Sequence, residues 1–221
     1  MKEIQELEKE IKRAAMLPLF YHPEKDICIE VTKALYAAGV RIIEFTARGE
    51  KALGNLEVLV AERDGSMPDL LLAVGTIRTA GQARQFLAAG ADFLISPVFD
   101  EGIHTYAKEQ QVLWIPGCMT PTEIHTAERA GCRLIKLFPG NVLGPSYVES
   151  ILPLFPDLEF IVTGGVDTSE QNIIAWFNAG VAGVGMGSKL ISRKLLNTKD
   201  YLTLQNETKT VLEIIKRLKT H

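Results

Sequence analysis

Four Ala-Gly pairs recur along the chain, and each one leads directly into a short apolar run. The pairs are Ala38-Gly39, Ala89-Gly90, Ala130-Gly131 and Ala179-Gly180. Glycine at such a place supplies the left-handed backbone conformation with which many helices end. A short apolar run bounded by turn residues is typical of a strand that is buried on both faces. The repeat therefore predicts that helices and strands alternate along the chain.

Read over the whole chain, the alternation predicts eight strands. We expect them at residues 14–20, 40–45, 69–74, 92–95, 112–115, 133–139, 159–162 and 181–184. We expect helices at residues 2–13, 24–38, 49–62, 79–89, 100–110, 121–130, 146–152, 168–178 and 198–219, with a turn at 64–66. Eight such units predict parallel strands with right-handed crossovers. Closure into a (β/α)8 TIM barrel with an extra N-terminal helix leaves no sheet edge exposed. An open doubly wound sheet is the alternative, but no Gly-x-Gly-x-x-Gly motif follows an early strand.

Length and composition are those of one ordinary globular domain, which we expect to span residues 1–221. The formal net charge of −3 gives no positive field that would attract nucleic acid or anionic lipid. No apolar run approaches the roughly 20 residues that cross a bilayer. The N-terminus carries acidic residues at once, which is atypical of a secretory signal. The three cysteines form no Cys-x-x-Cys motif, so we expect a reduced, cytoplasmic protein.

Lys136 lies in the middle of the apolar run from Arg133 to Pro139. Because side chains alternate between the faces of a strand, Lys136 is expected to share one face with Leu134 and Phe138. An amine that is buried there must find an anionic partner or lose its proton. A deprotonated lysine is a nucleophile for carbonyl carbon, as in Schiff-base enzymes. The alternative is a lysine whose amine reaches solvent at the end of the strand.

Glu44 is equally unusual, since it lies between Ile43 and Phe45 in the second predicted strand. Alternation places its carboxylate on one face together with Ile42 and Thr46. Lys136 and Glu44 could each compensate the burial of the other, either as a structural ion pair or as a working site.

Further polar residues follow the ends of other predicted strands, where barrel enzymes place their chemistry. Arg48 could hold a carboxylate, and Thr76 could bind a ligand oxygen or cap the next helix. Thr163-Gly164-Gly165 and Gly187-Ser188 follow the last two strands. Glycine-rich turns in these positions are where barrels hold phosphate, although they can also be turns without a ligand.

No metal site is expected, because none of the four histidines lies at ligand spacing from another histidine, a cysteine or a pair of carboxylates.

The ordered set of these motifs closely resembles the 2-keto-3-deoxy-6-phosphogluconate (KDPG) and 4-hydroxy-2-oxoglutarate (KHG) aldolase family. The motifs are Glu44, Arg48, Gly75-Thr76, Ser96-Pro97, Pro116-Gly117, Lys136-Leu137-Phe138-Pro139, Thr163-Gly164-Gly165 and Gly187-Ser188. The resemblance covers nearly the whole chain. It implies a class I aldolase, a lyase that needs no metal or other cofactor, on a TIM barrel that assembles as a homotrimer. Its substrate would be a keto-acid sugar, phosphorylated or not.

The resemblance also implies a role for each site residue. Lys136 resembles the lysine that forms the imine with the ketone, and Glu44 resembles the general acid and base. The binding residues that it implies are Arg48 and Thr76 for the pyruvate carboxylate, Pro97 and Phe138 for the pocket wall, Thr163 for a substrate hydroxyl, and Gly164, Gly165 and Ser188 for the phosphate.

The sequence does not decide which group the substrate carries at the end away from the ketone. KDPG, its galactonate epimer and hydroxyoxoglutarate differ away from the imine carbon. Lys189 stands where other members carry tryptophan, and the first strand ends in the bulky pair Phe20-Tyr21. A phosphosugar-binding barrel without catalysis, and a barrel isomerase with Lys136 as acid or base, are the alternatives of other kinds.

Overall fold

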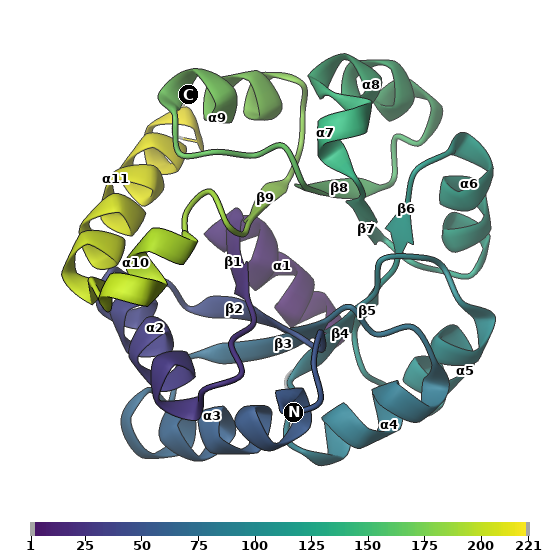
Figure 1. Ribbon diagram of the computed structural model, residues 1–221. Helices are drawn as coiled ribbons and strands as arrows, with labels where there is room; N and C mark the ends of the chain where they lie inside the picture. Colours follow the sequence, from purple (N-terminus) through teal and green to yellow (C-terminus); the bar gives the residue numbers. More distant parts are fainter. Residues whose placement is uncertain (1–2, 220–221) are drawn as a thin grey trace.

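The strands form one parallel sheet that curls into a barrel, as predicted (Figure 1). The computed structural model describes residues 3–219, so the first predicted helical position, Lys2, lies outside it. The sheet order is β5-β4-β3-β2-β1-β9-β8-β7-β6. The strands are β1 (Met16–Phe20), β2 (Ile42–Thr46), β3 (Leu71–Gly75), β4 (Phe93–Ile95), β5 (Trp114–Ile115), β6 (Gly117–Cys118), β7 (Leu134–Leu137), β8 (Glu159–Thr163) and β9 (Gly183–Met186).

Helices surround the barrel, and the first of them lies across one end of it (Figure 1). They are α1 (Ile4–Ala14), α2 (Lys25–Ala37), α3 (Ala52–Ser66), α4 (Ala80–Ala88), α5 (Glu101–Glu109), α6 (Pro121–Arg129), α7 (Gly140–Leu143), α8 (Pro145–Ile151), the 3-10 turn η1 (Leu152–Leu154), α9 (Glu170–Asn178), α10 (Arg193–Thr198) and α11 (Tyr201–Lys219). The glycines of the four Ala-Gly pairs all have positive φ, which confirms that they end helices in a left-handed conformation.

The fifth predicted strand, 112–115, is present as β5, and a further short strand that was not predicted, β6, follows it. Pro116 separates them, and proline has no amide hydrogen to donate to a neighbouring strand. Its carbonyl oxygen still accepts a hydrogen bond from the Lys136 amide at 2.9 Å. The barrel wall therefore continues past the proline, and β6 pairs Gly117 with Lys136.

One prediction on the helices was wrong. The predicted turn at 64–66 is the last turn of α3, where Ser66 Oγ donates to the Glu62 carbonyl at 3.0 Å. The final predicted helix, 198–219, is present as α11, while the short helix α10 before it was not predicted and is separated from α11 by Lys199 in a left-handed conformation. The short helix α7 was not predicted, since four residues carry no periodic signal.

The core has two layers, which the alternation of side chains predicted. Ile43, Phe45, Ile135 and Leu137 face outward, into the layer between strands and helices. Ile42 and Leu134 face inward, where they pack with residues from the other strands in a separate cluster inside the barrel. The inward face of β2 and β7 is therefore the face that carries Glu44 and Lys136.

Helix α1 closes one end of the barrel. It crosses behind the strands in Figure 1, and Leu7 and Ile11 on its buried face belong to the cluster inside the barrel. The amino-terminal ends of the strands are thus covered by apolar side chains. A ligand that reaches the barrel interior has to enter from the carboxyl ends of the strands, where the predicted site residues lie.

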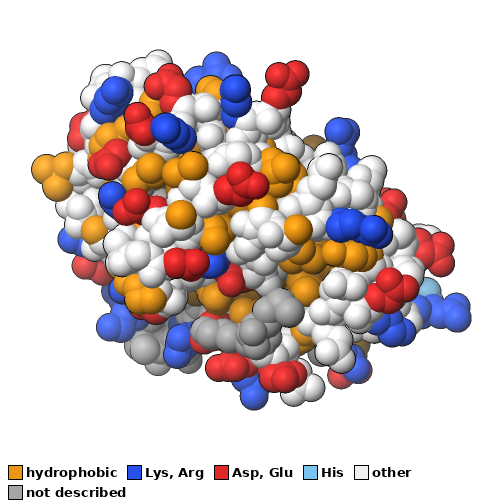
Figure 2. Space-filling model, turned by 90° about the horizontal axis from the view of Figure 1, so that it is seen from below, with side chains coloured by type: hydrophobic (Ala, Val, Ile, Leu, Met, Phe, Trp, Pro, Cys, Tyr) orange, Lys and Arg blue, Asp and Glu red, His pale blue; other side chains and the backbone are white. Residues whose placement is uncertain are grey.

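The surface carries charges of both signs, which are interspersed on the side of the molecule that Figure 2 shows. Within residues 3–219, no helix is both long and apolar enough to cross a membrane.

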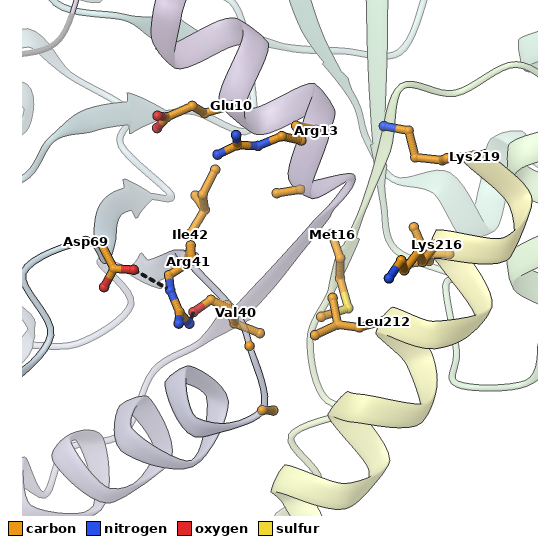
Figure 3. A pocket seen from close by; sticks show the side chains of 14 residues that line it. Glu10, Arg13, Met16, Val40, Arg41, Ile42, Asp69, Leu212, Lys216 and Lys219 are labelled. Atoms are coloured by element: carbon orange, nitrogen blue, oxygen red, sulfur yellow. Dashed lines mark hydrogen bonds and ion pairs between the residues drawn. The ribbon is translucent and has the colours of Figure 1, made fainter.

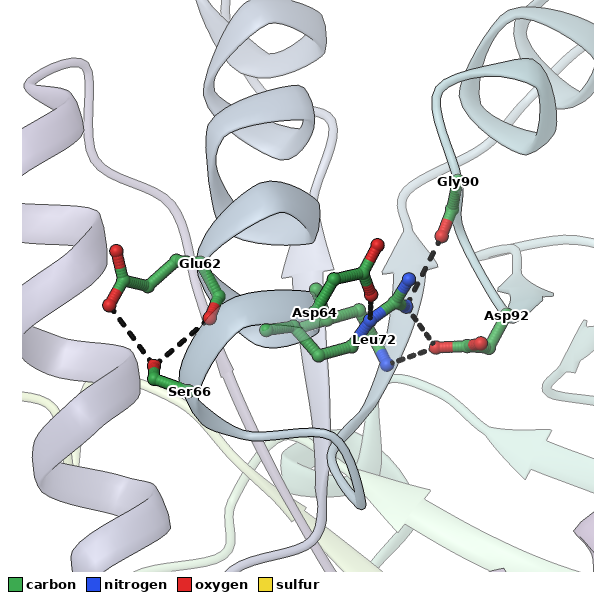
Figure 4. Close-up of polar contacts among 7 residues, drawn as sticks. Glu62, Asp64, Ser66, Leu72, Gly90 and Asp92 are labelled. Atoms are coloured by element: carbon green, nitrogen blue, oxygen red, sulfur yellow. Dashed lines mark hydrogen bonds and ion pairs between the residues drawn. The ribbon is translucent and has the colours of Figure 1, made fainter.

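Asp92 connects three segments at the amino-terminal side of the sheet (Figure 4). Its Oδ2 accepts a hydrogen bond from the Leu72 amide at 2.7 Å and one from Arg63 Nη1 at 2.8 Å. Arg63 also contacts the exposed carboxylate of Asp64 at 2.8 Å. Burial raises the pKa of Asp92, although the Leu72 amide and Arg63 both act to lower it. The network therefore compensates only part of the cost of burying this carboxylate.

We predict that Asp92→Ala lowers the free energy of unfolding by about 1–3 kcal/mol, because it removes the side-chain acceptor of the Leu72 amide and one acceptor of the mostly buried Arg63, which keeps Asp64 and the Gly90 carbonyl. Asp64→Ala is the matched control, since its carboxylate is 63% exposed and should contribute less than about 1 kcal/mol. Urea unfolding of the two variants measures the difference. Equal losses for both variants would contradict the role given to Asp92.

Candidate active site

Lys136 and Glu44 meet inside the barrel. Lys136 Nζ donates to Glu44 Oε1 at 3.1 Å and lies 3.4 Å from Oε2. The two side chains come from β7 and β2, which are separated by three strands in the sheet order, so the contact spans the barrel. Their side chains are only 7% and 2% exposed. The structure therefore gives the buried lysine an anionic partner, the first of the two outcomes expected from the sequence.

There is little free volume beside the pair. A cavity of about 10 Å³ lies beside it, which is at the limit for a single water molecule. The cavity is lined by Leu17, Glu44, Ile95, Ile115, Lys136, Ile161, Thr163 and Gly185. In so apolar a setting an amine and a carboxylate interact more strongly than in water.

Each member of the pair has one small neighbour in the sheet, which leaves room for its long side chain. Glu44 is paired in register with Ala73, and Lys136 is paired with Gly117 on one side. On its other side Lys136 pairs with Ile161, which in turn pairs with Gly183.

Arg48 and Thr76 lie together at the carboxyl ends of β2 and β3. Arg48 Nε approaches Thr76 Oγ1 at 3.5 Å, a long hydrogen bond. Arg48 is exposed and Thr76 is half-buried. Thr76 has a φ of 65°, which is unusual for a β-branched residue and is the kind of backbone strain that clusters at functional sites. The structure thus brings together the two groups that are predicted to hold a carboxylate.

Pro97 and Phe138 lie on the β4 and β7 sides of the same opening. The Phe138 ring centroid is 5.7 Å from Lys136 Nζ. The backbone of Pro97 passes so close to Gly117 that a Cβ on this glycine would lie 2.3 Å from the Pro97 carbonyl carbon. Ser96 Oγ accepts a hydrogen bond from Trp114 Nε1 at 2.8 Å and donates one to the Val98 carbonyl at 2.7 Å, which fixes the turn.

Thr163 ends β8, and its side chain borders the cavity beside Lys136. Gly164 and Gly165 follow with φ of 92° and 74°, a backbone conformation that side-chain-bearing residues rarely adopt. A Cβ on Gly165 would also lie 2.7 Å from Asn141 Cα. Ser188 is exposed in the turn after β9, the strand that pairs with β8. The two predicted phosphate turns are therefore neighbours at one side of the barrel opening.

Some residues of the site were missed from the sequence. Thr46 is buried and donates to the Phe20 carbonyl at 3.3 Å, which ties the end of β2 to β1. Leu17, Ile115 and Ile161 form apolar walls of the cavity beside Lys136. Apolar residues in predicted strands carry no signal that separates a wall of a site from the rest of the core. Asn141 could have been noticed as a polar residue just after the Pro139-Gly140 turn.

The cysteine thiols are not competing nucleophiles. Burial raises the pKa of Cys118 to about 12 and the pKa values of Cys28 and Cys132 to about 11. At neutral pH such thiols stay protonated, and a thiol is a poor nucleophile compared with its thiolate.

A larger cavity, of about 810 Å³, lies at the opposite, amino-terminal end of the barrel between α1 and α11 (Figure 3). Met16, Ile42 and Leu212 line part of it, and Arg41 pairs there with Asp69 at 2.6 Å. This pair is exposed, unlike Lys136 and Glu44, and it lies at the end of a barrel that supports stability and not chemistry. Size alone therefore does not mark the active site.

Within residues 3–219, no group of three or more His, Cys, Asp and Glu side chains is arranged to hold a metal ion.

Comparison with known proteins identifies the family. The sequence model of the KDPG and KHG aldolase family matches residues 7–206. The chain is 32% identical to 2-dehydro-3-deoxy-phosphogluconate aldolase of Treponema pallidum, over 71% of this chain and 73% of that protein. It is 31% identical to a probable 2-dehydro-3-deoxy-6-phosphogalactonate aldolase of Rhizobium meliloti, over 72% of this chain and 74% of that protein.

A solved structure agrees with this result. The KDPG aldolase of Legionella pneumophila, crystallised with pyruvate captured as a covalent carbinolamine, superposes with a TM-score of 0.83 and 27% identity, covering 90% of this chain and 94% of that one. The resemblance seen in the sequence motifs is confirmed. The chain belongs to the KDPG and KHG aldolase family and is an aldolase, a carbon–carbon lyase.

Proposed function

We propose that this aldolase cleaves 2-keto-3-deoxy-6-phosphogluconate to pyruvate and glyceraldehyde 3-phosphate through an imine on Lys136. The contact between Lys136 and Glu44 is the observation that carries the proposal. An amine that attacks a carbonyl must first lose a proton, and Glu44 lies 3.1 Å away, within range to accept it. Arg48 and Thr76 would orient the substrate by its carboxylate.

In the proposed reaction Lys136 Nζ adds to the C2 ketone, and loss of water from the carbinolamine gives a protonated imine. Glu44 then removes the proton of the C4 hydroxyl, directly or through a water molecule. The C3–C4 bond breaks, the aldehyde leaves, and the electron pair passes into the imine to give an enamine. Glu44 returns its proton to C3, and hydrolysis of the imine releases pyruvate and the free lysine.

The turns after β8 and β9 support a phosphorylated substrate. Gly164 and Gly165 have no side chains that would keep an anion from the backbone of this turn, and Ser188 adds an exposed hydroxyl-bearing residue from the neighbouring turn. Phe138 and Pro97 would wall the pocket, and Thr163 would contact a substrate hydroxyl. Hydroxyoxoglutarate has no phosphate and would leave these groups without a partner. We therefore favour the gluconate substrate, with its galactonate epimer as the alternative.

Neither of the alternatives of other kinds is supported. A barrel that only binds sugar phosphates has no use for an amine and an acid paired in the interior, where their burial is costly. An isomerase does not belong to this family.

We also propose that the protein works as a homotrimer in the cytoplasm, in line with the resemblance to its family and with the free thiols of Cys28, Cys118 and Cys132.

We predict that borohydride, added together with pyruvate, leaves a stable three-carbon adduct on Lys136. Peptide mass spectrometry locates it. Lys136→Met, which keeps most of the side-chain volume but lacks the amine, should form no adduct and should not cleave substrate. Lys108→Ala is the control, because this lysine is exposed on α5 and should leave adduct formation intact. An adduct on another lysine would exclude the proposed nucleophile.

We predict that Glu44→Gln lowers kcat by about 10²–10⁴-fold, the usual contribution of a general acid and base. Pyruvate should still be trapped on Lys136, because the amine remains. Exchange of the pyruvate methyl protons with deuterated solvent, followed by NMR, should slow together with kcat. Unchanged exchange in this variant would show that another group moves the proton.

We predict that Ser188→Ala raises KM for the phosphorylated substrate about tenfold, the effect of losing one hydrogen bond of about 1.4 kcal/mol to a charged group. Cleavage of hydroxyoxoglutarate by the same variant is the internal control and should be unchanged. Side-by-side values of kcat/KM for the two substrates measure this. An equal loss on both would place Ser188 outside the phosphate site.

A further inference from the structure

Gly75 ends β3, and its missing side chain is the space in which the Glu44 carboxyl group lies. A Cβ on Gly75 would lie 1.8 Å from Glu44 Oε1, 2.5 Å from Cδ and 2.7 Å from Cγ. Real Cβ atoms essentially never approach another heavy atom within 3.0 Å. Any larger residue at position 75 would therefore compete with most of the Glu44 side chain.

The backbone of Gly75 does not by itself require glycine. It is absent from the described glycines with positive φ, so alanine could adopt the same conformation. Its carbonyl oxygen accepts the Ala47 amide at 2.9 Å, a bond that alanine would keep. The requirement is for space beside Glu44 alone.

Glu44 cannot give way without losing its partner. It is 2% exposed, and its Oε1 is the atom that contacts Lys136 Nζ most closely. Because Cγ also clashes with the added Cβ, a rotation of the carboxylate alone is insufficient, and the whole side chain has to change rotamer. Such a change would carry the carboxylate away from Lys136.

We infer that Gly75 is a positioning residue of the reaction. Because it has no side chain, it leaves the space that the Glu44 side chain needs in order to contact Lys136. The inference rests on the proposed function, because Glu44 is the group that transfers protons. The steric coupling between positions 75 and 44 is independent of any activity, so the two can be tested separately.

The first test is kinetic. Gly75→Ala should have the same effects as Glu44→Gln. Borohydride should still trap pyruvate on Lys136, but kcat and the rate of exchange of the pyruvate methyl protons with solvent should each fall by about 100-fold or more. KM should change much less than kcat, because Arg48 and Thr76 are untouched. Gly54→Ala is the matched control, since no atom lies within 4 Å of a Cβ at this position on α3, and it should keep full activity. Wild-type cleavage and exchange in Gly75→Ala would overturn the positioning role.

The second test is a double-mutant cycle in thermal stability, which needs no activity. Gly75→Ala should lower Tm in the wild-type chain but not in Glu44→Ala, where no Cγ is left to clash. If Gly75→Ala does not fold, the double variant should fold, and failure of both to fold would overturn the inference. Equal Tm losses in the two backgrounds would overturn it too. Coupling in Tm together with a wild-type protein that forms no pyruvate adduct would overturn the proposed function and leave the steric coupling standing.

Discussion

Lys136 and Glu44 reach toward each other across the inside of the barrel, from strands that are not neighbours in the sheet. Removing either partner would leave an uncompensated buried charge, at a cost of roughly 3–5 kcal/mol. The surroundings accommodate the pair because Ala73 beside Glu44 and Gly117 beside Lys136 are small. A charge pair in this setting is poorly explained as a source of stability, since well-packed apolar residues of similar volume would serve as well. The proposed reaction, which needs an amine and an acid in contact, accounts for the pair.

The rest of the barrel controls access to this pair. Helix α1 covers the amino-terminal end with Leu7 and Ile11, so the interior opens only where the strands carry their polar carboxyl ends. Around that opening, Arg48 and Thr76 lie on one side and the turns after β8 and β9 on another. A keto acid that is held by its carboxylate at the first side would extend toward the second. In the proposed function, discrimination between substrates falls to these turns, while Lys136 and Glu44 lie deeper in the sheet.

Much of this could be predicted from the sequence, because its strongest signals are local. The Ala-Gly pairs mark helix ends. The alternation in β2 and β7 grouped Glu44 with Ile42 and Lys136 with Leu134, and the structure places both groups on the inner face. A charged residue in an apolar run is visible without any knowledge of its neighbours. Strand β6 beyond Pro116 and the helical state of residues 64–66 were not predicted, because each depends on hydrogen bonds that the local pattern does not reveal. The space that Gly75 leaves for Glu44 is of the same kind, since it follows from the packing of β2 against β3.

We propose that the nitrogen of Lys136 is the atom that bonds to the substrate ketone, with Glu44 beside it. A crystal structure of the wild-type protein soaked in pyruvate tests this most directly. We expect continuous electron density from Lys136 Nζ to C2 of pyruvate, the pyruvate carboxylate near Arg48 and Thr76, and the Glu44 carboxylate within hydrogen-bonding distance of the adduct. Pyruvate bound without a covalent bond to Lys136, or attached to a different residue, would contradict the account.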